Sequence, residues 1–208
     1  PPLCANHDNP SPYMCPTGWI RYDEGTVQIA GRTLVVPAFW IRKSEILYED
    51  YMNCVMSGEC DDFSDTIFDP FDPFNRCTPA TGPNMPVVCR TDSQLEDYAF
   101  WAGAFLPDET QWVYVATNSF RRGDNQMQRP TNYPWGSATP ACSYANLSCT
   151  SPPNPGEIEP VCSYLTGHNA SGVCDLIGNV AEIVYSESDG FAMLVGGSHS
   201  DSGYNVFN

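Results

Sequence analysis

The feature that most constrains the fold of this 208-residue chain is its ten cysteines. Their even number and local clustering are typical of disulfide-bonded proteins outside the reducing cytosol. The sequence alone does not determine which cysteines pair. Pairing in sequence order would close five short loops: Cys4 with Cys15, Cys54 with Cys60, Cys77 with Cys89, Cys142 with Cys149, and Cys162 with Cys174. We predict this pattern, and with it a secreted or extracytoplasmic protein, at the cell surface, in the periplasm or outside the cell.

Metal binding is the alternative use for so many cysteines. However, the sequence contains no Cys-x-x-Cys pair, and the three histidines, His7, His168 and His199, do not stand at the spacings of zinc ligands. Each histidine, taken alone, is predicted to be a loop or surface residue.

The charge balance narrows the classes of partner. Acidic residues outnumber basic ones by 25 to 9, which gives a formal charge of -16. Such a field repels nucleic acid and anionic membrane surfaces, and it favours cations or basic partners. No apolar run approaches the roughly 18 to 20 residues that a membrane helix needs. We therefore predict neither a nucleic-acid-binding nor a membrane-spanning protein.

A chain of this length is predicted to form one domain. Residues 1–18 are rich in Pro, Asn and Cys and suggest an irregular, disulfide-tied lead-in to a domain spanning residues 19–208. Short strands are predicted within residues 19–41, and further strands at 180–185 and 191–195. Nineteen prolines and long polar segments between these elements predict little regular secondary structure.

Three helices are predicted from apolar periodicity and capping residues. The first runs over residues 44–55 with Ser44 as its N-cap and ends near Gly58. The second is capped near Thr91 and ends at Gly103, and the third begins at Asp108. Residues 61–75 carry five aspartates between phenylalanines and two Asp-Pro steps, which predicts either a solvated loop or a calcium-binding loop.

Residues 172–182, Gly-Val-Cys-Asp-Leu-Ile-Gly-Asn-Val-Ala-Glu, combine a core patch with oxygen-bearing side chains. Asn179 and Glu182 stand three residues apart, so their oxygens and an intervening carbonyl could converge on a hard cation such as calcium. The alternative is a tight turn in which Gly178 provides a positive φ and Asn179 bonds to its own backbone. The residue types alone leave both interpretations open.

Several segments, taken in order, resemble one protein family. They are Phe39-Trp-Ile-Arg-Lys-Ser-Glu-Ile-Leu-Tyr-Glu-Asp-Tyr, Met85-Pro-Val-Val, residues 98–116, Tyr133-Pro-Trp-Gly, Tyr144-Ala-Asn, residues 172–182 and Val195-Gly-Gly-Ser. Their combination is similar to the formylglycine-generating enzyme, or sulfatase-modifying-factor, domain over about residues 19–200. The resemblance implies an α+β, C-type-lectin-like fold that is poor in regular secondary structure and stabilised by calcium.

The resemblance also implies where calcium would bind. By position, one site would use Asn179, the Val180 carbonyl and Glu182, and a second would use Asn146 with the Leu147 carbonyl. The family supplies an acidic ligand to the second site from the following loop. In this chain that loop offers Glu157 and Glu159, in uncertain register.

The sequence departs from the family where its copper chemistry resides. Catalytic members carry two cysteines shortly after Gly-Gly-Ser, and soft thiolates suit copper(I). Here Asp201 and Val206 stand at those positions, and no cysteine follows Ser198. An iron site would require His7, His168 and His199 to meet, and a serine hydrolase would require a Gly-x-Ser-x-Gly motif that the sequence lacks. The chain also ends before the family's closing strand, so we expect an incomplete domain.

Two functional hypotheses follow. The first is a secreted, non-catalytic binding or assembly module that acts with a protein partner or by self-assembly, and the missing cysteine pair favours it. The second is a copper-dependent oxidoreductase that acts on cysteine or another thiol, with its catalytic cysteines beyond Asn208.

Overall fold

The computed structural model describes residues 18–62, 79–117, 131–148, 157–186 and 190–201. Within these ranges the fold is α+β, with short strands, three α-helices and long connecting loops. The predicted lead-in, the aspartate-rich residues 63–75 and Val206 lie outside the described residues. No helix in the described ranges is long and apolar enough to cross a membrane.

The strands form three small antiparallel sheets of two strands each. β1 (Trp19–Tyr22) pairs with β4 (Phe39–Arg42), and β2 (Gly25–Ile29) pairs with β3 (Arg32–Val36) in a hairpin. β5 (Glu182–Tyr185) pairs with β6 (Ala192–Val195). The predicted strands at 180–185 and 191–195 are thus present, with shorter bounds.

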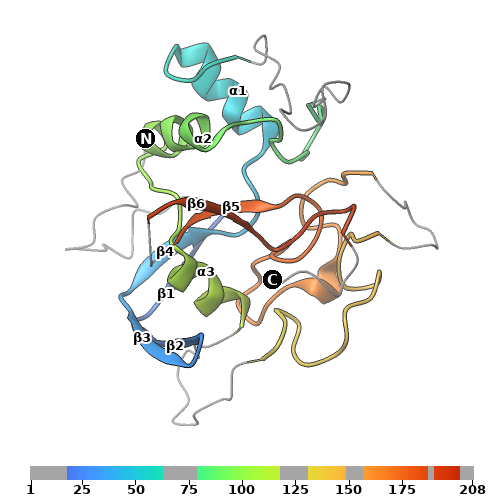
Figure 1. The fold of residues 1–208 in the computed structure, drawn as a ribbon. Helices are drawn as coiled ribbons and strands as arrows, with labels where there is room; N and C mark the ends of the chain where they lie inside the picture. The colour runs from blue at the N-terminus through green and yellow to red at the C-terminus, as the bar shows by residue number, and fades with distance from the viewer. Residues whose placement is uncertain (1–17, 63–78, 118–130, 149–156, 187–189, 202–208) are drawn as a thin grey trace.

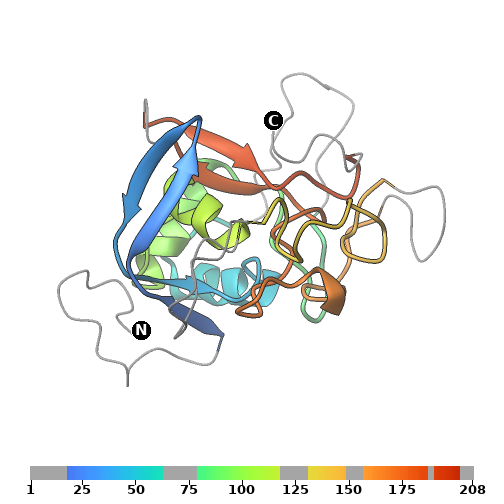
Figure 2. The same ribbon diagram turned by 90° about the horizontal axis from the view of Figure 1, so that it is seen from below.

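The first two helices lie side by side at one end of the molecule (Figure 1). They are α1 (Tyr48–Ser57) and α2 (Asp92–Trp101). α3 (Glu109–Ala116) contacts both the β2–β3 hairpin and β5. The loops that precede β5, together with a short 3-10 helix, η1 (Leu165–Gly167), lie on the side opposite the hairpin (Figure 2). The 172–182 stretch therefore lies among loops, helices and strands rather than on one sheet.

Local capping signals explain where two helices begin. Thr91 caps α2 in a capping box with Gln94, and Asp108 caps α3 in the same way with Gln111. The prediction for α1 was wrong at its start, because the helix begins at Tyr48 and its N-cap is Leu47, which makes no side-chain capping bond. Its end is as predicted, with Gly58 in the left-handed conformation.

The hydrophobic core has two parts. The larger cluster joins α3, the hairpin and the loop residues of the 172–182 stretch, and its buried members include Trp112, Leu176 and Ile177. The smaller one packs α1 against α2 through Tyr51, Cys54 and Tyr98. Leu176 and Ile177 are each 2% exposed, so the apolar patch of the stretch anchors it in the core.

Two of the five predicted disulfides lie wholly within the described residues. Cys54 is bonded to Cys60, and Cys162 to Cys174. Cys89 and Cys142 are also disulfide-bonded, but their predicted partners lie outside the described ranges, as do Cys4 and Cys15. The first bridge thus ties the end of α1 to the residues that follow it, and the second links two loop segments.

Candidate functional site

The structure brings Asn146 and Asn179 together although 33 residues separate them in the sequence. The Asn179 backbone N–H donates to the Asn146 carbonyl at 2.9 Å, and Asn146 Nδ2 donates to Asn179 Oδ1 at 3.1 Å. Gly178 permits this contact, because a Cβ there would lie 2.3 Å from the Asn146 carbonyl oxygen. Gly178 also has a φ of 81° and Asn179 one of 57°. The two asparagines predicted at separate calcium sites therefore belong to one network.

Glu45 completes this network from a distant part of the chain. Asn179 Nδ2 donates to Glu45 Oε2 at 3.0 Å, and the Val180 backbone N–H donates to Glu45 Oε1 at 3.2 Å. Glu45 is 7% exposed. Glu45 was not predicted as a site residue, since nothing in the neighbouring sequence distinguishes it from a helix-entry glutamate.

The loop acids lie beside the same asparagine. The Glu159 backbone N–H donates to Asn179 Oδ1 at 3.0 Å, and Asn179 Nδ2 donates to the Glu159 carbonyl at 3.1 Å. The Glu157 carbonyl accepts a bond of 2.8 Å from Asn146 Nδ2. Glu159 Oε1 is buried and has no hydrogen-bond partner. The loop whose register was uncertain thus contacts both asparagines through its backbone.

Three carboxyl groups around this network resist ionisation. Burial raises the pKa of Glu45 well above its usual range, and the charges of Asp175 and Glu182 raise it further. Burial is also the main cause that raises the pKa of Asp175 to about 6 and that of Glu182 to about 7. Hydrogen bonds oppose both shifts, from the Cys162 backbone to Asp175 and from Trp112 to Glu182. Asp175 lies in the 172–182 stretch but was not predicted as a site residue.

Glu182 is oriented differently from the asparagines. Its carboxylate accepts a hydrogen bond from the indole N–H of Trp112 on α3. Leu147, the other predicted contributor, is 4% exposed and lies against Gly178. The structure therefore gathers Asn146, Leu147 and Asn179 with the backbone of Val180, while Glu182 points toward α3 and a neighbouring pocket.

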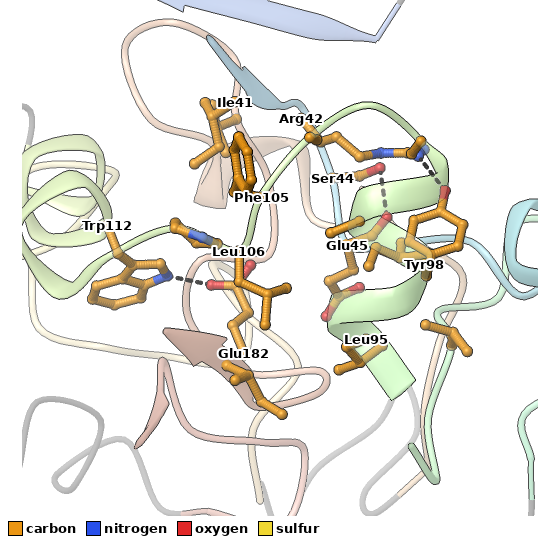
Figure 3. Close-up of a pocket in the computed structure, with 18 of the residues that line it drawn as sticks. Ile41, Arg42, Ser44, Glu45, Leu95, Tyr98, Phe105, Leu106, Trp112 and Glu182 are labelled. Atoms are coloured by element: carbon orange, nitrogen blue, oxygen red, sulfur yellow. Dashed lines mark hydrogen bonds between the residues drawn. The ribbon is translucent and has the colours of Figure 1, made fainter. Parts of the chain in front are cut away.

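This pocket has a volume of about 170 Å³ and lies between α2, β4 and β5 (Figure 3). Its walls are mostly apolar, and the charged residues that line it are Arg42, Glu45 and Glu182. Arg42 is already paired, with Asp50 at 2.6 Å and with the Tyr98 hydroxyl at 3.0 Å. A mainly apolar cavity with a few convergent polar groups is the usual form of a small-molecule site.

The Gly-Gly-Ser turn packs directly against the network. The Gly178 N–H donates to the Gly196 carbonyl at 3.0 Å, and a Cβ on Gly196 would lie 2.8 Å from the Leu176 carbonyl oxygen. Asp201 Oδ2 accepts bonds of 2.8 Å from both the backbone N–H and the hydroxyl of Ser198. Asp201, at the position where the resemblance implies a copper-binding thiol, is thus a hydrogen-bonded carboxylate, which does not fit copper(I).

The histidines have separate surroundings. His199 Nδ1 lies 3.1 Å from the Asn179 carbonyl, whereas His168 lies beside the Cys162–Cys174 disulfide. Burial lowers the pKa of His168, and the charge of Lys43 lowers it further. His7 lies outside the described residues.

Comparison with known proteins gives this site a context. The chain is 36% identical over 103 residues to a hercynine oxygenase from Mycolicibacterium thermoresistibile, an alignment that covers 48% of this chain and 20% of the relative. It is 38% identical over 97 residues to the hercynine oxygenase of Mycobacterium tuberculosis, covering 43% and 19% respectively. The matched region thus spans about a fifth of the length of these relatives.

These relatives contradict one prediction. The missing cysteine pair favoured a non-catalytic binding or assembly module, but the similar proteins carry the names of enzymes. The missing cysteine pair argues only against the copper chemistry that would use those cysteines. It was therefore not sufficient evidence for a non-catalytic protein.

The fold is shared with a solved structure described as the crystal structure of CarF. The TM-score is 0.63 with 19% sequence identity, and the match covers 90% of this chain and 89% of CarF. Residues 4–206 match the family described as the sulfatase-modifying factor enzyme 1-like domain. Since this match covers nearly the whole chain, the protein belongs to the sulfatase-modifying factor enzyme 1-like family.

Proposed function

We propose that this chain is the sulfatase-modifying-factor-like domain of an oxidoreductase of the oxygenase type, and that it binds a small substrate in the pocket beside Glu182. The observation that carries this proposal is the pocket itself, an apolar cavity with two acidic groups, Glu45 and Glu182. Within the described part of the chain, no basic side chain bonds to either of them. The family membership and the enzyme names of the relatives support it.

The charge of the pocket indicates the substrate class. Arg42 is paired with Asp50, so the remaining charged groups of the lining are acidic. A small molecule with a cationic group and an apolar body would fit this lining. Hercynine is the first compound to test, because the relatives are named for it.

An oxygenase needs a metal or another cofactor that reacts with oxygen, and the pocket residues do not indicate which one. Asp201 stands where a copper-binding thiol would be, and its carboxylate is engaged by Ser198. We therefore assign no reaction step to copper at this position. The contribution of the described residues is to bind and orient the substrate.

Oxygen uptake tests the proposal directly. The full protein would be mixed with hercynine and cysteine in two experiments, one with iron(II) and one with copper(I). Oxygen consumption would be recorded in each. We expect hercynine-dependent uptake with one of the metals, and a KM at least tenfold higher in Glu182→Gln. Glu49→Gln, on the exposed face of α1, is the matched control and should behave as the parent protein. Absence of uptake in both mixtures, with no hercynine binding by calorimetry, would refute the proposal.

We also propose that calcium binds beside Asn179, within the C-type-lectin-like arrangement that the resemblance implies. The residues present fit this ion in charge and donor type, since amide, carbonyl and carboxylate oxygens are the ligands calcium prefers. Two observations support it: Glu159 Oε1 is buried without a partner, and burial followed by the charges of Asp175 and Glu182 raises the pKa of Glu45. Asn146 lies in the same network, and the Leu147 side chain lies against Gly178. A divalent ion would relieve this repulsion. The extracytoplasmic location stays a prediction from the cysteines.

A further inference from the structure

The Cys162–Cys174 disulfide lies beside His168, a residue that has no role in the pocket beside Glu182. The sulfurs of Cys162 and Cys174 and a ring nitrogen of His168 all lie within 4.8 Å of one another. Among the described residues, these are the three potential metal-ligating side chains whose ligand atoms lie this close together. Two sulfurs and an imidazole form the donor set that closed-shell, thiophilic ions select.

His168 has an unused donor or acceptor at this place. Its Nε2 is buried and makes no hydrogen bond, although buried polar atoms almost always have a partner. Cys174 Sγ lies 3.3 Å from the Lys43 carbonyl, which accepts a bond of 2.9 Å from the Cys174 backbone N–H. One polar atom beside the bridge, His168 Nε2, is therefore left without a partner in the oxidised state.

The backbone around the cluster is held by contacts that do not involve the bridge. Asn169 is 5% exposed, and its Nδ2 donates to the Tyr22 hydroxyl at 3.0 Å and to the Val115 carbonyl at 3.1 Å. Its Oδ1 accepts from the Val173 N–H at 2.9 Å. The Cys162 N–H donates to Asp175, and the Cys174 N–H to the Lys43 carbonyl. These bonds would keep the three side chains together after the disulfide is reduced.

We propose that reduction of the Cys162–Cys174 disulfide converts this cluster into a binding site for a thiophilic d¹⁰ cation, Zn²⁺ or Cu⁺, with His168 as the third ligand. A dithiol supplies two electrons and two protons, its own sulfurs become a disulfide, and Cys162 and Cys174 become thiols. Binding of the cation then releases these two thiol protons, because thiolates are the ligands. The site is distinct from the turn that carries Ser198 and Asp201.

Metal titration of the reduced chain tests this assignment. The full protein would be reduced anaerobically with a dithiol, freed of reductant, and titrated separately with Zn²⁺ alone and Cu⁺ alone against a competing chelator. We expect one equivalent more in the parent protein than in the double variant Cys162→Ser, Cys174→Ser, which retains the other eight cysteines. Tighter retention of one ion identifies which cation the site prefers.

Two histidine variants test whether His168 is a ligand of the cation. His168→Ala should weaken binding of the preferred ion at least tenfold, whereas His199→Ala, whose ring contacts the Asn179 carbonyl, should not change it. Substituting Cys54 and Cys60 by Ser should leave the extra equivalent in place.

Three results would overturn the proposal. They are equal stoichiometry in the Cys162/Cys174 double variant, unchanged affinity in His168→Ala, and loss of near-ultraviolet circular dichroism on reduction, which would mean that no folded site remains. Binding of the same equivalent by the oxidised protein would also contradict it, since the sulfurs would then not be the ligands.

Discussion

The side-chain amide of Asn179 donates a hydrogen bond of 3.0 Å to Glu45 Oε2, a residue 134 positions earlier in the chain. The same asparagine bonds to Asn146 and to the backbone of Glu159. One buried side chain therefore ties the entry to α1 to two loops that have no regular structure. Its removal would leave several buried polar groups without partners.

We expect Asn179→Ala to destabilise the protein by about 2 to 4 kcal/mol, because unsatisfied buried groups bear their full desolvation cost. Urea unfolding followed by fluorescence would measure this loss. Gln28→Ala is the control, since Gln28 bonds to Thr33 on the exposed face of the hairpin and should cost little. Equal midpoints for the two variants would contradict a central role for Asn179.

Gly178 and Gly31 form a matched pair for testing close backbone approach. Both have a positive φ, 81° and 76°, but a Cβ would lie 2.3 Å from the Asn146 carbonyl oxygen at Gly178 and would meet nothing within 4 Å at Gly31. Alanine at either position bears the left-handed backbone cost of about 1 to 2 kcal/mol. We expect Gly178→Ala to lose roughly 1 to 3 kcal/mol more through overpacking. Thermal melting of the two variants measures the difference, and similar melting temperatures would argue against the tight contact.

The stability of the calcium-free protein should fall as pH rises. Because the pKa of Glu182 rises from 4.5 to about 7 on folding, the folded state binds more protons than the unfolded state between these values. Its contribution is fully present below pH 4.5 and is lost as pH rises through 7, and the raised pKa of Asp175 acts in the same direction. We expect a loss of about 1 to 3 kcal/mol from Glu182 across this window.

Urea unfolding at several pH values in excess chelator would measure this slope. The glutamine of Glu182→Gln cannot ionise, so the stability of this variant should depend less on pH. Glu49→Gln should leave the pH dependence unchanged. A slope that is the same in Glu182→Gln as in the parent protein would show that Glu182 has no such role.

Calcium should raise the melting temperature, and chelation should lower it. Binding to the folded state alone adds RT ln(1 + [L]/Kd) to its stability. Asn179→Ala should reduce this response, whereas Gln28→Ala should not. Differential scanning fluorimetry with and without calcium measures it, and melting that does not change in excess chelator would remove the calcium proposal.

Substitution of Asp108 tests a local feature that the sequence predicts. Asp108 Oδ1 accepts from the Gln111 N–H at 2.7 Å, and the Gln111 side chain accepts from the Asp108 N–H at 3.2 Å. Asp108→Ala should cost about 0.5 to 2 kcal/mol, whereas Asp108→Asn should cost less because it keeps the capping oxygen. Chemical denaturation of both variants measures these losses, and equal losses would show that the cap does not act through its oxygen.

Local chemistry in the sequence determined the elements that depend on near neighbours. The caps at Thr91 and Asp108, the end of α1 at Gly58, and the disulfides Cys54–Cys60 and Cys162–Cys174 are all formed within 12 residues of sequence. Such signals suffice when the interacting groups are held close together by the chain itself. The calcium site predicted at Asn179 and Glu182 from the 172–182 stretch stays a prediction, and the Glu182 carboxylate accepts its hydrogen bond from Trp112.

The tertiary structure alone decided which distant groups meet. Glu45 reaches Asn179 across 134 residues, and Trp112 reaches Glu182 across 70, and neither pairing leaves a periodic or compositional trace. The same is true of His168, whose place beside Cys162 and Cys174 depends on the path that Asn169 fixes against Tyr22. Loops without hydrogen-bonded periodicity follow paths that core packing and long-range hydrogen bonds select, so the pocket and the sulfur–imidazole cluster emerge only once the chain has folded.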